Sequence, residues 1–183
     1  MRDLRWEILS SRYIHKSNWA TLRVDQCRLP DGRIMDDYYV LEYPNWVNGV
    51  AITEEGKVLI VHQYRNAAQI TAVEIPGGVI DGDEAPEDAI KRELLEETGY
   101  AFEHAELIGS QYPNPATSTN ITFFYLLKNG KKVQAQQFDE HEDLVVEEVS
   151  IEQFKEMVLA NKLSQALHQS AAFLALVRLG LLK

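Results

Sequence analysis

Glu93, Glu96 and Glu97 lie in a stretch whose residue types favour a helix. At about 100° per residue, Glu93 and Glu97 are about 40° apart around such a helix, and Glu96 is about 60° to the other side. The three carboxylates therefore share one face. Like charges at these spacings destabilise an isolated helix, but a hard cation such as Mg²⁺ prefers oxygen ligands and commonly bridges to substrate phosphates. The alternative is a solvated acidic helix face.

These glutamates end a longer pattern that begins at Gly78. Five residues separate Gly78 from Glu84, and seven separate Glu84 from the run Arg92-Glu93-Leu94-Leu95-Glu96-Glu97-Thr98-Gly99-Tyr100. This spacing matches the Nudix box, Gly-x5-Glu-x7-Arg-Glu-U-x-Glu-Glu-x-Gly-U, where U is a bulky apolar residue. The chain therefore resembles the Nudix hydrolases, and its expected fold class is α+β, a Nudix α/β/α sandwich with a mixed sheet.

The resemblance implies a role for each residue of the box. Glu93 and Glu97 would bind the metal together with the Gly77 carbonyl, and Glu96 would assist them. Arg92 would orient the helix carboxylates, as its i, i+4 relation to Glu96 allows. The cofactor implied is Mg²⁺, with Mn²⁺ as a substitute.

Segments outside the box resemble the ADP-ribose pyrophosphatase branch of the family. Arg65 and Glu74, on the strands that lead into the box, would hold the substrate. Pro115 falls 16 residues after Gly99, where the branch carries a proline close to the substrate. The usual Ser-Pro-Gly of the branch is Asn114-Pro115-Ala116 here, which leaves the identity of the sugar open.

The run Asp139-Glu140-His141-Glu142-Asp143 resembles the acidic catalytic loop of that branch. The resemblance assigns Glu140 as the base that activates water and Glu142 as an additional metal ligand. In an extended backbone these two side chains would point the same way, because they are two residues apart. If Glu140 is not the base, Glu96 is the next candidate, and the alternative for the whole run is a solvated acidic loop.

The reaction that these resemblances imply is hydrolysis of the diphosphate linkage of a nucleoside-diphosphate sugar. ADP-ribose is the leading substrate, giving AMP and a sugar phosphate. GDP-mannose, other nucleotide sugars and dinucleotide diphosphates remain alternatives. A further alternative is a Nudix-like sensor that binds nucleotide without turnover, but the box keeps all of its carboxylates, which favours an enzyme.

Composition limits the classes that remain. The chain has 183 residues, with 18 Lys and Arg against 28 Asp and Glu, for a net charge of −10. The acidic balance argues against nucleic-acid binding, which needs a basic footprint. We expect no membrane span, because no apolar run approaches about 18 residues, and no secretory signal at the N-terminus. A single cysteine, Cys27, permits no internal disulfide, so we expect a cytoplasmic protein.

The elements that must position the box follow from apolar patterning and turn residues. Pro86 in the first turn and Gly99 after the last predict a helix that starts near Ala85-Pro86 and continues to Thr98. Pro76-Gly77-Gly78 is expected to stop the strand before it. Other strands are predicted over 47–53, 57–62, 72–75, 106–112, 121–127 and 143–149. A capping box at Ser150 predicts a helix to about Asn161, and Ser164 is expected to cap a last helix with an apolar stripe of Leu167, Ala171, Leu174 and Val177.

The chain divides near residue 45 into an N-terminal β-extension, 1–45, and a Nudix hydrolase domain, 46–183. Extended segments over 19–28 and 33–43 flank a turn at 29–32, which predicts a small antiparallel meander. Such a meander is marginally stable alone, and it carries aromatic residues that suit an interface. Its architecture resembles the dimer-forming extension of the branch. We therefore expect a homodimer that acts on a small nucleotide-sugar substrate.

Overall fold

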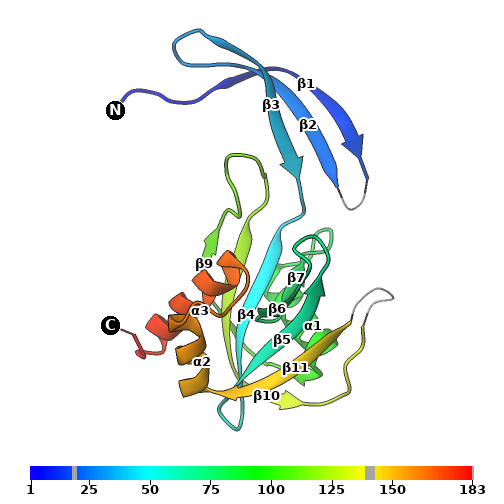
Figure 1. Cartoon of the computed structure of the whole chain (residues 1–183), viewed down its shortest axis with the longest axis vertical. Helices are drawn as coiled ribbons and strands as arrows, with labels where there is room; N and C mark the ends of the chain where they lie inside the picture. Colours follow the sequence, from blue (N-terminus) through cyan, green and yellow to red (C-terminus); the bar gives the residue numbers. More distant parts are fainter. Residues whose placement is uncertain (18–19, 139–142, 183) are drawn as a thin grey trace. The chain divides into compact units, whose positions relative to one another are not determined.

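The computed structural model describes residues 1–17, 20–138 and 143–182. Two compact units make up the chain (Figure 1). One contains Met1–Pro44 together with Tyr112–Ile121, and the other contains Asn45–Gln111 and Thr122–Lys183. No signal in the sequence indicated that a loop from the second half of the chain would pack with the N-terminal residues.

The N-terminal unit is an antiparallel meander of β1 (Glu7–Lys16), β2 (Thr21–Arg28) and β3 (Ile34–Glu42). The turn between β2 and β3 is closed by a hydrogen bond from the Gly32 N–H to the Leu29 carbonyl, 2.9 Å long. Strand β1 is exposed over almost its whole length. It therefore lacks the alternation of apolar and polar residues that would have predicted it from the sequence.

Residues Tyr112–Ile121 attach to β3 through backbone and side-chain hydrogen bonds. The Leu41 N–H donates to the Thr117 carbonyl at 2.7 Å, and the Thr119 N–H donates to the Leu41 carbonyl at 3.2 Å. The Tyr38 hydroxyl donates to the Ala116 carbonyl at 2.6 Å. Pro115 therefore belongs to a loop that is held by the N-terminal meander.

The second unit is built on one mixed sheet of eight strands, in which β4 and β10 are parallel and the other pairs are antiparallel. The strand order is β11-β5-β4-β10-β8, with β6 on β5, β7 on β4 and β9 on β10. The strands are β4 (Trp46–Thr53), β5 (Lys57–Arg65), β6 (Ile70–Glu74), β7 (Gly77–Val79), β8 (Tyr100–Ala101), β9 (Ala105–Gln111), β10 (Thr122–Lys132) and β11 (Leu144–Ser150). The helices are α1 (Pro86–Thr98), α2 (Ile151–Leu159) and α3 (Ala166–Arg178).

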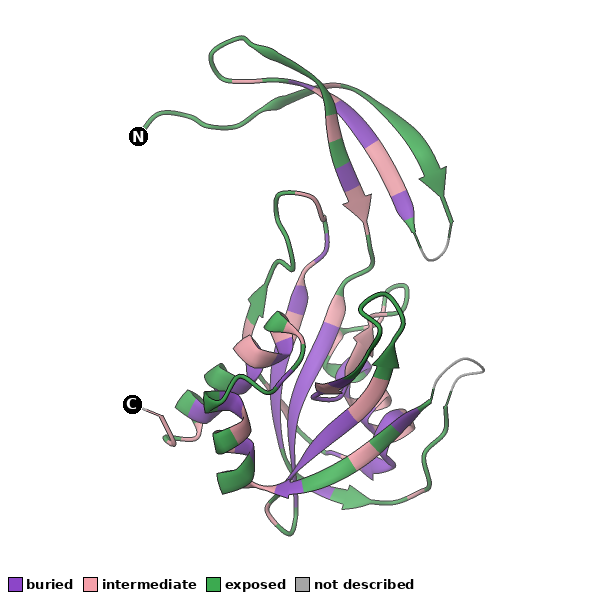
Figure 2. Cartoon of the chain, viewed as in Figure 1, coloured by how far each residue is buried: buried purple, intermediate pink, exposed green. Residues whose placement is uncertain are grey.

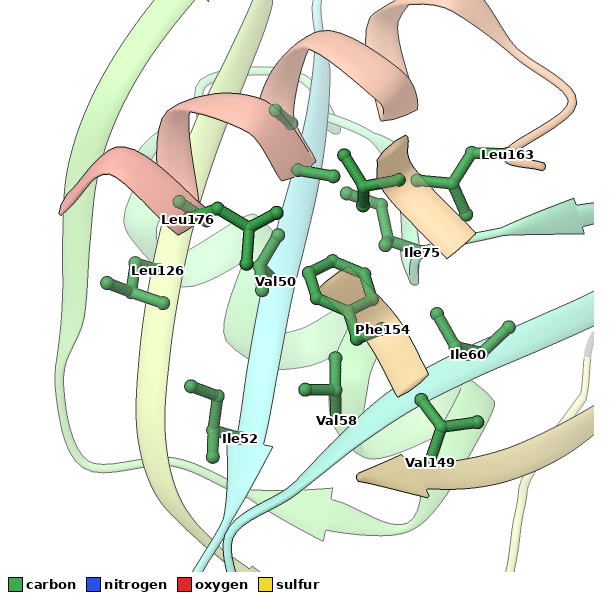
Figure 3. Close-up of a cluster of buried hydrophobic side chains, with 14 of the residues drawn as sticks. Val50, Ile52, Val58, Ile60, Ile75, Leu126, Val149, Phe154, Leu163 and Leu176 are labelled. Atoms are coloured by element: carbon green, nitrogen blue, oxygen red, sulfur yellow. The ribbon is translucent and has the colours of Figure 1, made fainter. Parts of the chain in front are cut away.

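Helices cover both faces of this sheet, and the buried residues follow its central strands (Figure 2). On one face, Ile90 and Leu94 of α1 pack in a cluster with Val47 of β4. On the other, Phe154 of α2 packs in a second cluster with Val50 of β4 and with α3 (Figure 3). Strand β4 reaches both clusters because successive side chains of a strand point to opposite faces. The expectation of an α+β sandwich with a mixed sheet is confirmed.

The capping box that the sequence predicted for α2 is present. The Ser150 hydroxyl accepts from the Gln153 N–H at 3.1 Å, and the Gln153 side chain accepts from the Ser150 N–H at 2.8 Å. Helix α1 begins at Pro86 and ends at Thr98, and it is capped by Gly99, whose φ of 76° is left-handed. Both features are local, so residue type and spacing were sufficient to place these helix ends.

The start of α3 and its buried face differ from the prediction. The N-cap is Gln165, whose side chain accepts from the Leu167 and His168 N–H groups, and not Ser164. Leu174 and Val177 of the expected stripe are exposed. The buried residues are His168, Ala171, Ala172, Ala175 and Leu176. The small side chains of Ala171, Ala172 and Ala175 let this face of the helix lie close to the sheet, which leaves Leu174 and Val177 exposed.

Across the described ranges, α1, α2 and α3 all fall short of the length and apolar character that a helical membrane crossing requires.

Candidate active site

Helix α1 rests its apolar side on the sheet and turns its glutamates toward β7. Ala89, Ile90 and Leu94 are fully buried. Strand β7 pairs antiparallel with β4, with Gly77 opposite Asn48 and Gly78 opposite Val47. As expected, the strand before Pro76-Gly77-Gly78 ends there, at Glu74; the two glycines then begin a separate strand, β7, beside β4.

The two glycines are required by close approach. A Cβ atom on Gly77 would lie 2.2 Å from the Val47 carbonyl oxygen. A Cβ atom on Gly78 would lie 2.3 Å from the carboxylate carbon of Glu93. Any side chain at Gly78 would therefore displace Glu93, and the Glu93 carboxylate packs directly on the backbone of β7.

Glu97 joins the helix to the same strand. The Glu97 residue is 5% exposed, and its Oε2 atom accepts a hydrogen bond of 3.1 Å from the Gly77 N–H. A buried carboxylate is stabilised by such a donor. Glu93 and Glu97 are thus held on adjacent turns of α1 against two consecutive glycines of β7.

Arg92 binds more partners than the sequence suggested. Its guanidinium donates to Glu96 at 3.0 Å, as the i, i+4 spacing predicted, and also to Glu93 at 3.0 Å. It further donates to both oxygens of Glu84 at 3.1 Å and to the Val79 carbonyl at 3.0 Å. The guanidinium holds the pKa of Glu84 below its ordinary value, and the surrounding carboxylates, Glu84 first, raise the pKa of Arg92.

Sequence reasoning missed the part of Glu84 in this network. Glu84 is a specified residue of the box, and that position was the available signal. Glu84, in the loop before α1, accepts hydrogen bonds from both Nε and Nη2 of Arg92. Arg92 therefore joins that loop, β7 and the acidic face of the helix.

Arg65 and Glu74 are paired with each other across the β5–β6 ladder. The Arg65 guanidinium donates to the two Glu74 oxygens at 3.2 and 2.5 Å. The Glu74 side chain is buried, while that of Arg65 is 43% exposed. A buried carboxylate thus fixes a partly exposed guanidinium, a geometry that suits an anionic ligand.

Three predicted site residues remain. Glu140 and Glu142 are outside the residues that the structure describes. Pro115 lies in the Tyr112–Ile121 loop of the other unit. The structure therefore brings together Gly77, Arg92, Glu93, Glu96 and Glu97 at α1 and β7, and separately Arg65 with Glu74.

The donor set fits a hard divalent cation in its chemistry. It consists of carboxylate and backbone oxygens, and Mg²⁺ is commonly held by one or two carboxylates together with water and substrate phosphates. Within 1–17, 20–138 and 143–182, no group of three or more His, Cys, Asp or Glu side chains is arranged to hold a metal ion alone. Glu93 and Glu97 present two carboxylates, the number by which Mg²⁺ is commonly held together with water and substrate phosphates.

Comparison with known proteins agrees with this geometry. Residues 43–170 match the model of the NUDIX domain, and residues 6–41 match that of the nucleoside diphosphate sugar hydrolase N-terminal domain. The chain is 29% identical to an ADP-ribose pyrophosphatase of Bacillus subtilis over 91% of its own length and 90% of that protein. It is 32% identical to a methanol dehydrogenase activator of Bacillus methanolicus over 79% of its length and 78% of that protein.

Among solved structures, the crystal structure of an ADP compounds hydrolase superposes with a TM-score of 0.84 at 19% identity, covering 99% of this chain and 97% of that one. The fold is therefore shared over nearly the whole length. With a NUDIX match over most of the chain and the box carboxylates packed on β7, the chain belongs to the Nudix family and is a hydrolase.

Proposed function

We propose that this Nudix hydrolase cleaves the diphosphate linkage of a nucleoside-diphosphate sugar, with ADP-ribose as the leading substrate, and releases AMP and a sugar phosphate. The observation that carries the proposal is the packing of Glu93 and Glu97 against the glycines of β7. The match of residues 6–41 to a nucleoside diphosphate sugar hydrolase domain supports the substrate class. The likeness to an ADP-ribose pyrophosphatase supports the choice of sugar.

Nudix hydrolases generally use divalent metal ions, and we propose Mg²⁺ for this chain, with Mn²⁺ as a substitute. Glu93, Glu97 and the Gly77 carbonyl would hold it, with Glu142 as a further ligand. When bound, such a cation neutralises the charge of the diphosphate. Arg92 keeps the carboxylates of Glu93 and Glu96 in place through its hydrogen bonds.

The other residues of the proposal bind substrate or move a proton. Arg65 would pair with a phosphate oxygen of the substrate, positioned by the buried carboxylate of Glu74. Glu140 would accept the proton of the attacking water, because carboxylates committed to a cation are weak bases. Pro115 would shape the loop near the substrate.

We also propose that the protein is a cytoplasmic homodimer. Support for the dimer comes from the meander, which exposes several large apolar side chains: Trp6, Ile8, Tyr13, Ile14, Ile34, Met35 and Tyr39. Support for the compartment comes from the single, buried Cys27.

A substrate panel tests the proposed reaction. The full chain is incubated with Mg²⁺ and, separately, ADP-ribose, ADP-glucose, GDP-mannose and a dinucleoside diphosphate, and phosphomonoester products are detected by phosphate release with an added phosphatase. We expect the highest kcat/KM for ADP-ribose. A preference for GDP-mannose would change the assigned substrate but keep the assigned reaction. Tight nucleotide binding without turnover would instead support a nucleotide sensor.

A further inference from the structure

The segment that leads into α3 is hydrogen-bonded to the outer edge of β6. The Ser164 N–H donates to the Val73 carbonyl at 2.9 Å, and the Val73 N–H donates to the Ser164 hydroxyl at 2.9 Å. Two residues further on, the Ile75 N–H donates to Nδ1 of His168 at 3.2 Å. Alternate residues of β6 and its extension are therefore bound from the C-terminal part of the chain.

This edge needs partners because β6 pairs with β5 on one side only. An edge strand presents unpaired N–H and C=O groups along its free side. Ile75 is fully buried, so water does not replace an acceptor for its N–H. The imidazole ring of His168 supplies that acceptor.

The residues that follow Ile75 belong to the active site. The Pro76 carbonyl accepts from the Gly49 N–H at 2.9 Å, and the Gly77 N–H donates to Glu97. Glu74, the residue before Ile75, pairs with Arg65. The hydrogen bond from Ile75 to His168 therefore lies between the predicted substrate pair and the predicted metal site, on one continuous stretch of backbone.

His168 is suited to accept this bond permanently. The residue is 4% exposed, and its pKa is lowered to about 4. Burial is the main cause and the positive charge of Arg65 adds to it, while the negative charge of Glu74 acts in the opposite direction. The ring is therefore neutral at pH 7. Because Nδ1 accepts from Ile75, the single ring proton resides on Nε2.

We propose that His168 is a positioning residue of the hydrolase: it fixes the Ile75 backbone and so sets where Glu74 and Gly77 lie on either side of it. This inference rests on the proposed function, because it concerns the placement of residues assigned to that reaction. Helix α3 thereby acts on the reaction from the opposite face of the sheet to α1.

Variants at position 168 separate the hydrogen bond from the volume of the side chain. His168→Leu fills the site without an acceptor, and His168→Asn places its Oδ1 near the position of Nδ1. The matched control is Leu176→Ala, about two turns along α3 in the same buried cluster as Ile75, which opens a cavity but keeps the His168 ring that accepts from the Ile75 N–H. If His168→Leu does not fold, His168→Met serves instead, because its flexible chain fills irregular gaps.

The measurements are kcat and KM for ADP-ribose with saturating Mg²⁺, well below each melting temperature. We expect His168→Leu to lose about 10-fold to 10²-fold in kcat/KM, the range that a small misplacement of catalytic groups produces. His168→Asn should recover most of that loss. Leu176→Ala should lower Tm but keep wild-type kcat/KM. Wild-type kcat/KM in His168→Leu would overturn the proposal, as would an equal loss in Leu176→Ala.

Amide hydrogen exchange at Gly77 and Gly78 tests the same inference without turnover. We expect faster exchange at both in His168→Leu than in Leu176→Ala, after correction for global stability, and normal exchange in His168→Asn. Unchanged protection of the two glycines in His168→Leu would contradict the proposal. If the wild-type chain hydrolyses none of the nucleotide sugars, the proposed function fails. These exchange rates then test by themselves whether His168 fixes the backbone between Glu74 and Gly77.

Discussion

Two hydrogen bonds join the Arg92 guanidinium on α1 to the Glu84 carboxylate in the loop before it. The pKa of Glu84 lies below its ordinary value, so the pair stabilises the fold fully at a pH above that ordinary value, near 4.5. This contribution is lost as the pH falls toward the lower folded pKa. Acid therefore weakens the attachment of the loop before α1.

Glu84→Gln tests this pair. We expect the free energy of unfolding to fall by about 1–2 kcal/mol at pH 7, the range for a hydrogen bond to a charged group that is partly exposed. The difference from wild type should narrow at pH 3.5, which is below the ordinary pKa of a glutamate, because the unfolded wild-type chain then binds a proton at Glu84 more readily than the folded chain does. Urea unfolding at both pH values measures it. An equal difference at pH 7 and 3.5 would show that charge is not involved.

The resemblance assigns different roles to two nearby glutamates, Glu140 as the base and Glu142 as a metal ligand, and substitutions can distinguish these roles. Glu140→Gln should lose about 10²–10⁴ in kcat, the usual contribution of a positioned general base, with the Mg²⁺ requirement nearly unchanged. Glu142→Gln should instead raise the Mg²⁺ concentration needed for half-maximal rate. Steady-state kinetics across a Mg²⁺ titration distinguish them. Near-normal turnover of Glu140→Gln at saturating Mg²⁺ would move the base elsewhere, with Glu96 the next candidate.

Residue spacing alone placed Glu93, Glu96 and Glu97 on one face of a helix, because helical geometry is local. It did not show that Glu97 binds the Gly77 N–H or that Glu93 packs on Gly78. Those contacts depend on the pairing of β7 with β4, which joins residues about 30 positions apart. Tertiary pairing of this kind has no local pattern from which to predict it.

At the scale of the element, helix α1 depends on its C-terminal glycine. Gly99 has a φ of 76°, and a Cβ atom there would lie 2.2 Å from the Gln134 carbonyl oxygen. Gly56 has nearly the same φ, 75°, but nothing within 4 Å of its Cβ position. The two glycines therefore share the backbone conformation and differ in the space around them.

Gly56→Ala should cost about 1–2 kcal/mol, the price of the left-handed conformation for an L-residue. Gly99→Ala should cost at least about 1 kcal/mol more, because the backbone oxygen of Gln134 must move. Chemical denaturation of both variants gives the comparison. Equal losses would mean that the close contact at Gly99 relaxes without cost.

Helix ends that are marked by local capping residues could be predicted from the sequence. Helix ends that depend on tertiary contacts could not. The capping box of α2 and the ends of α1 are examples of the first kind. The start of α3 is of the second kind, since Ser164 is bound to Val73 of β6 and leaves the cap to Gln165. Strand β1 escaped prediction because its side chains are exposed on both faces.

For the whole molecule, the N-terminal meander matters because a loop from the second half of the chain depends on it. Three strands with one of them exposed on both faces are marginally stable alone. The loop Tyr112–Ile121 depends on β3 for its hydrogen bonds. Removing the meander would therefore free a loop that carries Pro115.

Deletion of residues 1–45 tests the proposed dimer. We expect an aggregating protein or an inactive monomer, observed by size-exclusion chromatography with light scattering and by the hydrolysis assay. In the full chain, Ile14→Lys in the exposed strand β1 should weaken the dimer, whereas Val145→Lys, at a residue that is also exposed but lies in β11, should not. A soluble and fully active monomer after the deletion would refute the role of the extension.

We infer that the carboxylates packed on β7 support cation-dependent hydrolysis of a nucleotide sugar. The most direct test is the initial rate of ADP-ribose hydrolysis against free Mg²⁺ for the wild type, Glu93→Gln, Glu97→Gln and the control Glu87→Gln, whose carboxylate pairs with Lys91 on the exposed side of α1. We predict no rate with EDTA, losses of about 10²-fold or more for Glu93→Gln and Glu97→Gln with the fold intact by circular dichroism, and a wild-type titration for Glu87→Gln. Full activity in EDTA, or wild-type rates in both site variants, would contradict the account.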